Sequence, residues 1–121
     1  MNNLEKEIKE YLEERGWNNK MVSDYAKSIS IEAAELLEIF QWRAMNADDV
    51  KKDSEAFGKV KKELADVLIY CLDIAVALNI HPDEIIREKL AHNKAKFPAG
   101  VVKGNSARYY EIKKEYRKRG E

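Results

Sequence analysis

Residues that break helices or cross-link chains are scarce in this sequence. Its 121 residues include five glycines, two prolines and one cysteine, and no stretch alternates apolar and polar residues as strands do. These shortages predict an all-α chain. A lone cysteine excludes an intramolecular disulfide, and because Cys71 lies in an apolar run we expect a small buried side chain there.

Net charge and long apolar runs are missing as well. The 22 Lys and Arg residues balance 22 Asp and Glu residues, so overall charge gives no attraction to a nucleic acid polymer or an anionic membrane. No apolar run approaches the ~18 residues of a membrane span, and the first residues show no signal-peptide pattern. We therefore expect a cytoplasmic protein without membrane partners.

Helical periodicity is what the sequence does contain. Apolar residues recur every three or four positions in stretches that predict four helices, over about residues 3–15, 21–45, 54–79 and 82–96. The polar stretch 46–53 predicts a loop, with Asp53 among the candidate N-caps, and Pro82 suits the first position of the fourth helix. Residues 1–98 are thus expected to form one four-helix, bundle-like domain.

A basic tail follows at residues 99–121. It contains Gly100 and Gly104 and ends in a run rich in lysine and arginine. Residues 107–118 can form a short helix, and a partly disordered end is the alternative. We expect this tail to complete the functional site or an oligomer.

Two acidic pairs carry the strongest chemical signal. Glu32 and Glu35, and then Glu63 and Asp66, are each three residues apart, so the carboxylates of a pair lie side by side on one helix face. Solvated acidic pairs are common on helices, but here apolar residues flank both pairs and no basic residue follows Glu32 or Glu63 at four positions. A divalent cation would offset the repulsion among half-buried carboxylates. Oxygen-only ligands favour Mg²⁺, with Mn²⁺ as a substitute, over zinc.

Histidine is absent where a di-iron carboxylate site would need it. Such sites use Glu-x-x-His on two helices. The third residue after Glu32 is Glu35, the third after Glu63 is Asp66, and His81 and His92 fall elsewhere. We assign neither histidine a catalytic role.

Two further groups of residues are weaker candidates for binding a ligand. Three share a face of the predicted fourth helix and would either hold phosphate oxygens or form its solvated face: Lys89, Asn93 and Lys96. Three aromatic residues would either stack on a nucleobase or belong to the core: Trp17, Trp42 and Tyr70. The spacing leaves both alternatives open.

The ordered set of motifs resembles a known family. Glu-x-x-Glu at 32–35 precedes Glu-x-x-Asp at 63–66, and the stretches 35–42, 63–70, 89–98 and 105–109 add to the likeness. The chain resembles the all-α, MazG-like nucleoside triphosphate pyrophosphohydrolases, and within them the dCTP pyrophosphatase group. The resemblance covers about residues 17–109.

This resemblance implies Mg²⁺-dependent hydrolysis of a nucleoside triphosphate to the monophosphate and pyrophosphate, with dCTP and modified deoxynucleotides as candidate substrates. It implies a metal held by the catalytic carboxylates Glu32, Glu35, Glu63 and Asp66. It also implies phosphate contacts from Lys89, Asn93 and Lys96, a sugar or phosphate contact from Tyr70, and a base bordered by Trp17 and Trp42. The family forms tight dimers or tetramers, so we expect a homodimer or a dimer of dimers.

One departure from the dCTP pyrophosphatase group concerns the base. Its base-contacting histidine has no counterpart in residues 3–15, so a cytosine preference does not follow. The alternative function is a helical module that binds a partner or a nucleotide without hydrolysing it.

Overall fold

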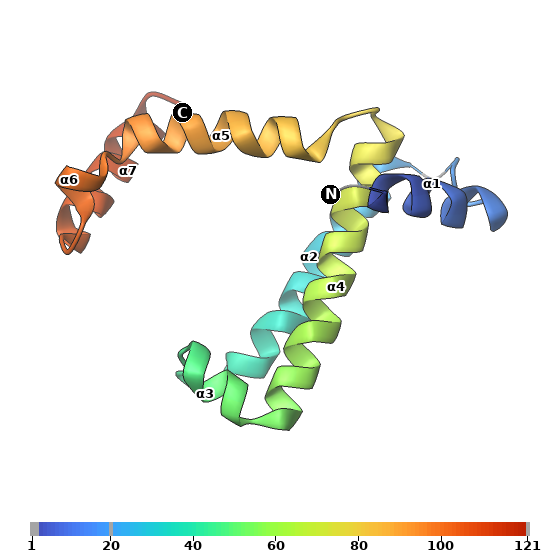
Figure 1. Cartoon of the computed structure of the whole chain (residues 1–121), viewed down its shortest axis with the longest axis horizontal. Coiled ribbons are helices and arrows are strands. Elements are labelled where there is room, and N and C mark those ends of the chain that lie inside the picture. The colour runs from blue at the N-terminus through green and yellow to red at the C-terminus, as the bar shows by residue number, and fades with distance from the viewer. Residues whose placement is uncertain (1–2, 20, 121) are drawn as a thin grey trace. The chain divides into compact units, whose positions relative to one another are not determined.

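The computed structural model describes residues 3–19 and 21–120, which form helices joined by turns, with no strand among them. The helices are α1 (Leu4–Glu14), α2 (Val22–Phe40), α3 (Ala47–Lys52), α4 (Ser54–Ala77), α5 (Pro82–Lys96), α6 (Ala99–Val102) and α7 (Ser106–Lys118) (Figure 1). The predicted all-α class is confirmed. The chain divides into two compact units, Met1–Pro82 and Asp83–Glu121, each described below by itself.

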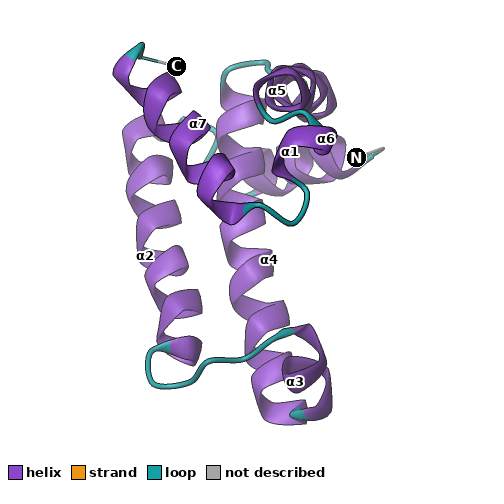
Figure 2. Ribbon diagram, turned by 90° about the vertical axis from the view of Figure 1, so that its left-hand side faces the viewer, coloured by secondary structure: helices purple, strands orange, loops and turns teal. Residues whose placement is uncertain are grey.

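The centre of the first unit is the pair formed by α2 and α4. The two helices run antiparallel and lie side by side in both views (Figures 1 and 2). Their less exposed residues recur with the helical period: Tyr25, Ile29, Glu32 and Leu36 on α2, and Ala56, Val60, Glu63, Val67 and Tyr70 on α4. Two carboxylates therefore lie among the apolar residues through which these helices pack.

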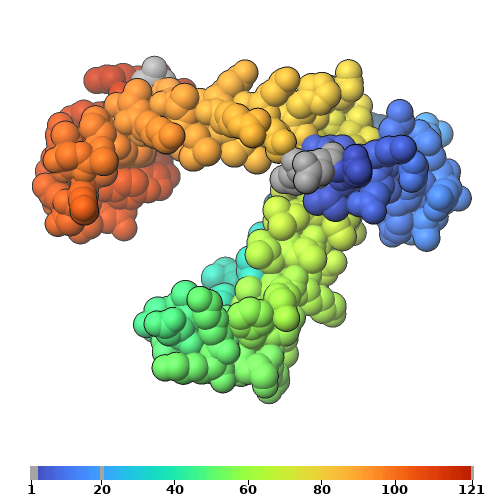
Figure 3. Space-filling model, in the orientation of Figure 1, coloured from blue at the N-terminus to red at the C-terminus, as the bar shows by residue number. Residues whose placement is uncertain are grey.

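The connection between α2 and α4 differs from the predicted loop. The second helix ends at Phe40 instead of residue 45, and residues 47–52 form α3. A capping box begins α3, because Asn46 Oδ1 accepts a hydrogen bond from Asp49 N (2.9 Å) and Asp49 Oδ2 accepts one from Asn46 N (3.1 Å). In Figure 3 the green atoms of this segment lie against those of the start of α4. The loop prediction was wrong because six residues are too few to display an apolar period.

Asp53 fixes the start of α4, as predicted. Its Oδ1 accepts a hydrogen bond from Ala56 N (3.0 Å), and its Oδ2 lies 2.8 Å from Arg43 Nη2. The capping hydrogen bond and Arg43 hold the pKa of Asp53 below its ordinary value. One carboxylate thus caps α4 and ties the chain that leaves α2 to the beginning of α4.

A tight turn after α1 positions Trp17. Gly16 adopts a positive φ of 67°, which glycine tolerates without steric cost. Trp17 N then donates to Leu12 O (2.9 Å), and Trp17 O accepts a hydrogen bond from the buried Tyr25 Oη (3.1 Å). The backbone of Trp17 is therefore held to both α1 and α2.

The core of the single chain is thin, and several large apolar side chains are exposed. Cys71 is exposed, so the prediction that it is buried was wrong. Leu64 and Leu68 precede it by seven and three positions and are also exposed, and on α2 the exposed fraction of Leu37 is 67%. One helix pair buries only the facing sides of α2 and α4, which leaves their other apolar side chains uncovered. We call Leu64, Leu68 and Cys71 the apolar stripe of α4.

The second unit comprises residues 83–121. Pro82 occupies the first position of α5, as predicted. Phe97 packs on Tyr109 with ring centroids 4.8 Å apart, and Ile112 of α7 is buried. In the tail the structure has the helical alternative, α7, preceded by the single turn of α6. Within residues 3–19 and 21–120, no single helix is both long and apolar enough to cross a membrane.

Candidate active site

Three of the four predicted carboxylates meet between α2 and α4. One carboxylate oxygen from each of Glu32, Glu63 and Asp66 lies within 4.8 Å of the others. Glu63 and Asp66 share a face of α4 because they are three residues apart, and Glu32 faces them from α2. We call these three residues the carboxylate triad.

The triad has the donor chemistry and the environment of a divalent cation site. All three side chains are half-buried. Oε2 of Glu32 and Oε2 of Glu63 are both shielded from solvent, and neither accepts a hydrogen bond from residues 3–19 or 21–120. Shielded carboxylate oxygens without donors are costly to bury, and hard cations such as Mg²⁺ and Mn²⁺ prefer oxygen ligands. The residues therefore fit such an ion.

Crowding of the carboxylates changes their protonation. Burial, followed by the neighbouring carboxyl groups of Glu35, Asp66 and Glu63, raises the pKa of Glu32 from 4.5 to about 7. The pKa of Glu63 is also raised, chiefly by its interaction with the Glu35 carboxyl and then by burial. Without a cation, the site therefore retains a proton near neutral pH.

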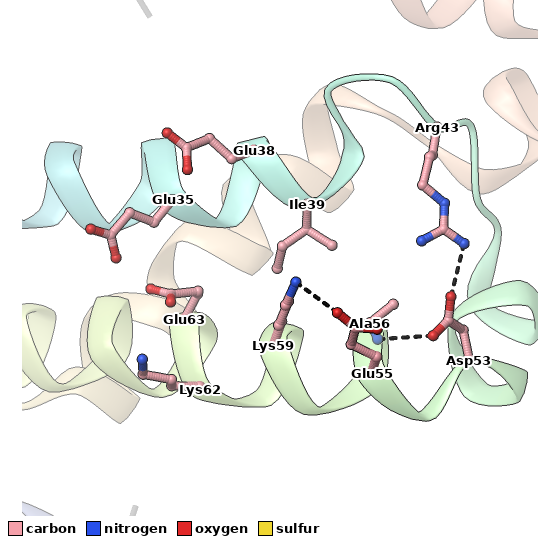
Figure 4. A pocket seen from close by; sticks show the side chains of 10 residues that line it. All are labelled: Glu35, Glu38, Ile39, Arg43, Asp53, Glu55, Ala56, Lys59, Lys62 and Glu63. Carbon is pink, nitrogen blue, oxygen red and sulfur yellow. Dashed lines mark hydrogen bonds and ion pairs between the residues drawn. The ribbon is translucent and has the colours of Figure 1, made fainter.

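Glu35 lies at the edge of the triad and not within it. Its side chain is exposed, and Figure 4 shows it pointing from α2 toward Glu63 on α4, while Glu38 points away. Its carboxyl group still raises the pKa of both Glu32 and Glu63. Glu35 thus faces solvent while remaining close enough to act on the triad.

A cavity of about 590 Å³ opens beside Glu35 and Glu63 (Figure 4). Both basic and acidic residues line this cavity, and two of the basic residues form ion pairs. Lys59 Nζ lies 3.1 Å from Glu55 Oε1, and Arg43 pairs with Asp53 as described above. Lys62 adds a third positive charge, which acts to lower the pKa of Glu63. Of these basic residues, Lys62 is thus the one that acts on a member of the triad.

An aromatic pocket of about 240 Å³ adjoins the triad at Asp66. The residues that line it come from α1, the following turn, α2 and α4: Tyr11, Leu12, Trp17, Tyr25, Asp66, Ile69, Tyr70 and Asp73. The rings of Tyr11 and Trp17 meet edge to face at 5.8 Å between centroids. Two of the predicted base contacts, Trp17 and Tyr70, therefore lie in one pocket next to the carboxylates.

Trp42 lies apart from this aromatic pocket. It follows α2 whereas Trp17 precedes it, so about 28 Å of helix separates the two indoles along the chain. The exposed fraction of Trp42 is 87%. Within a single chain, the two tryptophans do not border the same ligand.

The predicted phosphate contacts belong to α5, in the second unit. Lys89 is exposed, whereas Asn93 and Lys96 are half-buried. Lys96 Nζ lies 4.7 Å from the centroid of the Tyr116 ring and 5.2 Å from that of Phe97. Aromatic rings therefore hold the Lys96 ammonium group locally.

Among the pocket residues to which sequence reasoning gave no functional role are two with polar side chains at low exposure, Tyr25 and Asp73. Both are buried, and Asp73 has an exposed fraction of 3%. Asp73 belongs to the polar stripe of α4 that also carries Glu63, Asp66 and Tyr70, with spacings of three, four and three. This polar stripe is the sequence feature that could have identified Asp73, because it continues along α4 from Glu63 and Asp66 to the residues of the aromatic pocket.

Comparison with known proteins places the chain in a family. The profile of the MazG-like family matches residues 27–112, which include the carboxylate triad. The chain belongs to the MazG-like family. The resemblance inferred from the motifs is thereby confirmed.

Two curated relatives of this MazG-like chain are mammalian. It is 24% identical over 109 residues to dCTP pyrophosphatase 1 of Mus musculus and 26% identical over 105 residues to dCTP pyrophosphatase 1 of Homo sapiens. Each match covers 85% of this chain and 62% of the relative. The MazG-like chain therefore spans less than two thirds of the length of these relatives.

A solved structure shares the fold. A pyrophosphatase from Archaeoglobus fulgidus is 38% identical to this MazG-like chain and superposes with a TM-score of 0.69. The match covers 79% of this chain and 90% of that one. Most of this fold is thus also found in a protein described as a pyrophosphatase.

Proposed function

We propose that the chain is a Mg²⁺-dependent nucleoside triphosphate pyrophosphohydrolase, which releases a nucleoside monophosphate and pyrophosphate. The observation that carries this proposal is the carboxylate triad, whose shielded oxygens suit a hard cation in a chain of the MazG-like family. The names of the similar proteins, a dCTP pyrophosphatase and a pyrophosphatase, support the same reaction class.

In the proposed reaction, water oxygen forms a bond to the α-phosphorus, and the bond from that phosphorus to the oxygen bridging the α and β phosphates breaks. The electron pair leaves with pyrophosphate, and the water loses a proton. A bound Mg²⁺ would neutralise phosphate charge and lower the pKa of a coordinated water. Glu32, Glu63 and Asp66 would hold that ion.

Glu35 is the carboxylate we propose to orient the attacking water and accept its proton. It is exposed and lies outside the group of three, so it can face a water molecule while Glu32 and Glu63 engage the ion. A general base must lie within hydrogen-bond reach of the proton it takes. The position of Glu35 beside Glu63 supports that role.

The remaining predicted contacts complete the proposal. Tyr70 and Trp17 would contact the sugar and the base in the aromatic pocket, because both line it next to Asp66. Lys89, Asn93 and Lys96 would bind phosphate oxygens. Trp42 would border a base in a neighbouring subunit of a homodimer or homotetramer, which its high exposure leaves available.

The proposal is tested by measuring release of pyrophosphate and of nucleoside monophosphate from a panel of natural and modified triphosphates. Each is assayed with Mg²⁺, with Mn²⁺ and with chelator. We expect both products in equal amounts, with either metal and not with chelator. The rank order across bases and sugars then identifies the substrate.

Glu63→Gln and Glu55→Gln form a matched pair for this assay. Both residues lie on α4, but Glu55 pairs only with Lys59 at the surface, where ion pairs contribute little. We expect Glu63→Gln to abolish turnover and Glu55→Gln to retain it. A folded wild-type protein that turns over no triphosphate would instead support the module that binds a partner or nucleotide without hydrolysis.

A further inference from the structure

Asp73 is a buried acid for which the proposed reaction has no use. It lines the aromatic pocket, and its exposed fraction is 3%. The exposed fractions of Tyr25 and Leu12, which also line the pocket, are 4%. Trp17 and Tyr11, at 40% and 41%, form the open side of the pocket. Asp73 therefore lies at the deep end, among apolar and aromatic groups.

Tyr25 does not provide Asp73 with a proton. The phenol donates its hydrogen to Trp17 O at 3.1 Å, which leaves none for a second acceptor. Burial first, and then the negative charge of Asp73, raises the pKa of Tyr25. The deep end of the pocket thus combines a buried carboxyl group with a phenol whose hydrogen is donated to Trp17 O.

Asp73 lies on the same helix, α4, as two residues of the triad, Glu63 and Asp66. Asp66 belongs to both the triad and the pocket, and Asp73 lies seven residues further along the same helix face, a rise of about 10 Å. Tyr70 lies between them. This order is that of phosphate, sugar and base in a nucleotide, and the rise is comparable with the reach from a phosphate to the far edge of its base.

We propose that Asp73 selects the base, favouring nucleobases that present an exocyclic amino group to the deep end of the pocket. This inference rests on the proposed function, because the substrate is a nucleotide held at the triad. The amino group donates to the carboxylate, whereas an oxo group at the same place brings two acceptors together and is rejected. A carboxylate has about four acceptor positions, so it can accept from a base in addition to its other contacts.

Rigid walls make such a selection effective. Trp17 is fixed by Tyr25 through its carbonyl oxygen and by Leu12 O through its backbone N–H. The Arg15 guanidinium lies 4.2 Å above the Tyr11 ring, which in turn meets Trp17 edge to face. A base that stacks on an aromatic face of this pocket has less freedom to move away from Asp73.

The test uses pairs of nucleotides that differ only in this substituent. dCTP and dUTP differ by amino against oxo on a pyrimidine, and dATP and dITP differ in the same way on a purine. For the wild-type chain we expect kcat/KM to favour the amino member of at least one pair by about tenfold or more, the range for a hydrogen bond to a charged group. In Asp73→Asn, whose amide offers both a donor and an acceptor, that ratio should fall toward one.

Controls separate base selection from a structural role. Asp48→Asn removes an exposed acid from α3 and should leave the ratio unchanged. Tyr25→Phe should lower kcat/KM for both members of a pair alike, because it loosens Trp17. An Asp73→Asn protein that folds by circular dichroism and keeps the wild-type ratio would overturn the proposal, as would wild-type ratios near one in both pairs.

A binding measurement distinguishes failure of this proposal from failure of the proposed function. Calorimetric titration with dCMP and dUMP, or dAMP and dIMP, in the presence of chelator needs no turnover. If no triphosphate is hydrolysed but the amino nucleotide binds about tenfold more tightly, the reaction is wrong and the role of Asp73 stands. If triphosphates are hydrolysed and neither binding nor kcat/KM discriminates, the role of Asp73 is wrong and the reaction stands.

Discussion

At the scale of single residues, the carboxylate triad sets protonation against metal binding. Glu32, with a pKa of about 7, is at the centre of this competition because burial and three neighbouring carboxyl groups disfavour its charged form. A cation reverses the preference, since it stabilises the ionised group. Protons and a metal cation therefore compete for the same carboxylates.

Metal-free protein should lose stability as the pH rises. The folded state binds a proton at Glu32 more tightly than the unfolded chain, whose carboxyl has its ordinary pKa of 4.5. This stabilising contribution is complete below pH 4.5 and is lost as the pH rises through about 7. In chelator, Tm should fall across this window, and Glu32→Gln should reduce the fall.

Added Mg²⁺ should remove that dependence. The ion replaces the proton, so Tm at the upper end of the window should rise with metal in the wild type and not in Glu32→Gln. Glu55→Gln is the control, because its carboxylate is at the surface beside Lys59. If Tm in chelator depends on pH identically in the wild type and in Glu32→Gln, Glu32 is not the group that titrates.

Asp66→Asn and Glu35→Gln should separate activity from folding. Each removes a negative charge needed at the site, so we expect kcat to fall at least about 100-fold. Tm in chelator should be unchanged or higher, because each change also relieves repulsion among the carboxylates. Near wild-type kcat in either variant would contradict the four-carboxylate site.

At the scale of helices, α3 depends on its cap more than on apolar contacts, since none of its residues is buried. Asn46→Ala should lower the free energy of unfolding by about 1 kcal/mol, the usual cost of losing such a cap. Asn46→Ser keeps a capping oxygen and should stay close to wild type. Urea unfolding measures both, and equal losses in the two variants would show that the capping oxygen is not the cause.

The helices also show what the sequence could and could not predict. Apolar periodicity identified α1, α2, α4 and α5, and the acidic pairs on α2 and α4 predicted carboxylates that do converge. Residues 47–52 lack such a period, so α3 was recognisable only from Asn46 and Asp49 three positions apart, with acids in its first turn and lysines in its last. The local sequence pattern predicts where most helices lie, but it does not predict which carboxylates come closest to one another.

The distinction between Glu35 and the triad illustrates that limit. Glu32 and Glu35 are equivalent in a sequence pattern of i and i+3, yet only Glu32 joins Glu63 and Asp66 within 4.8 Å. The difference arises from how α2 is rotated against α4, which side-chain packing along the whole pair determines. The pocket around Asp73 requires α1 and its turn as well, so no single stretch of sequence reveals it.

At the scale of the whole molecule, exposed apolar side chains predict an oligomer. No side chain in the described part of the chain is buried to below 2% exposure, while Leu37 on α2 and the apolar stripe of α4 are uncovered. Such surfaces are typical of protein interfaces. By light scattering, the wild type should have at least twice the 14.0 kDa mass of one chain.

Lysine at these positions should disrupt the assembly. Leu37→Lys and Leu68→Lys place charge on the exposed apolar surface, so the mass should fall toward that of one chain. Glu55→Lys is the control, because Glu55 lies nine residues before Leu64 and hence on the opposite side of α4. A monomeric wild type, or variants with unchanged mass, would contradict this interface.

The exposed thiol of Cys71 gives the assembly a chemical reporter. It is the only cysteine in the sequence, and it lies on the apolar stripe three residues after Leu68. If a second copy covers the stripe, alkylation of this thiol must await dissociation, so its rate would increase on dilution and report the kinetics of subunit exchange without any introduced label. In Leu68→Lys the reaction should instead be fast at every protein concentration.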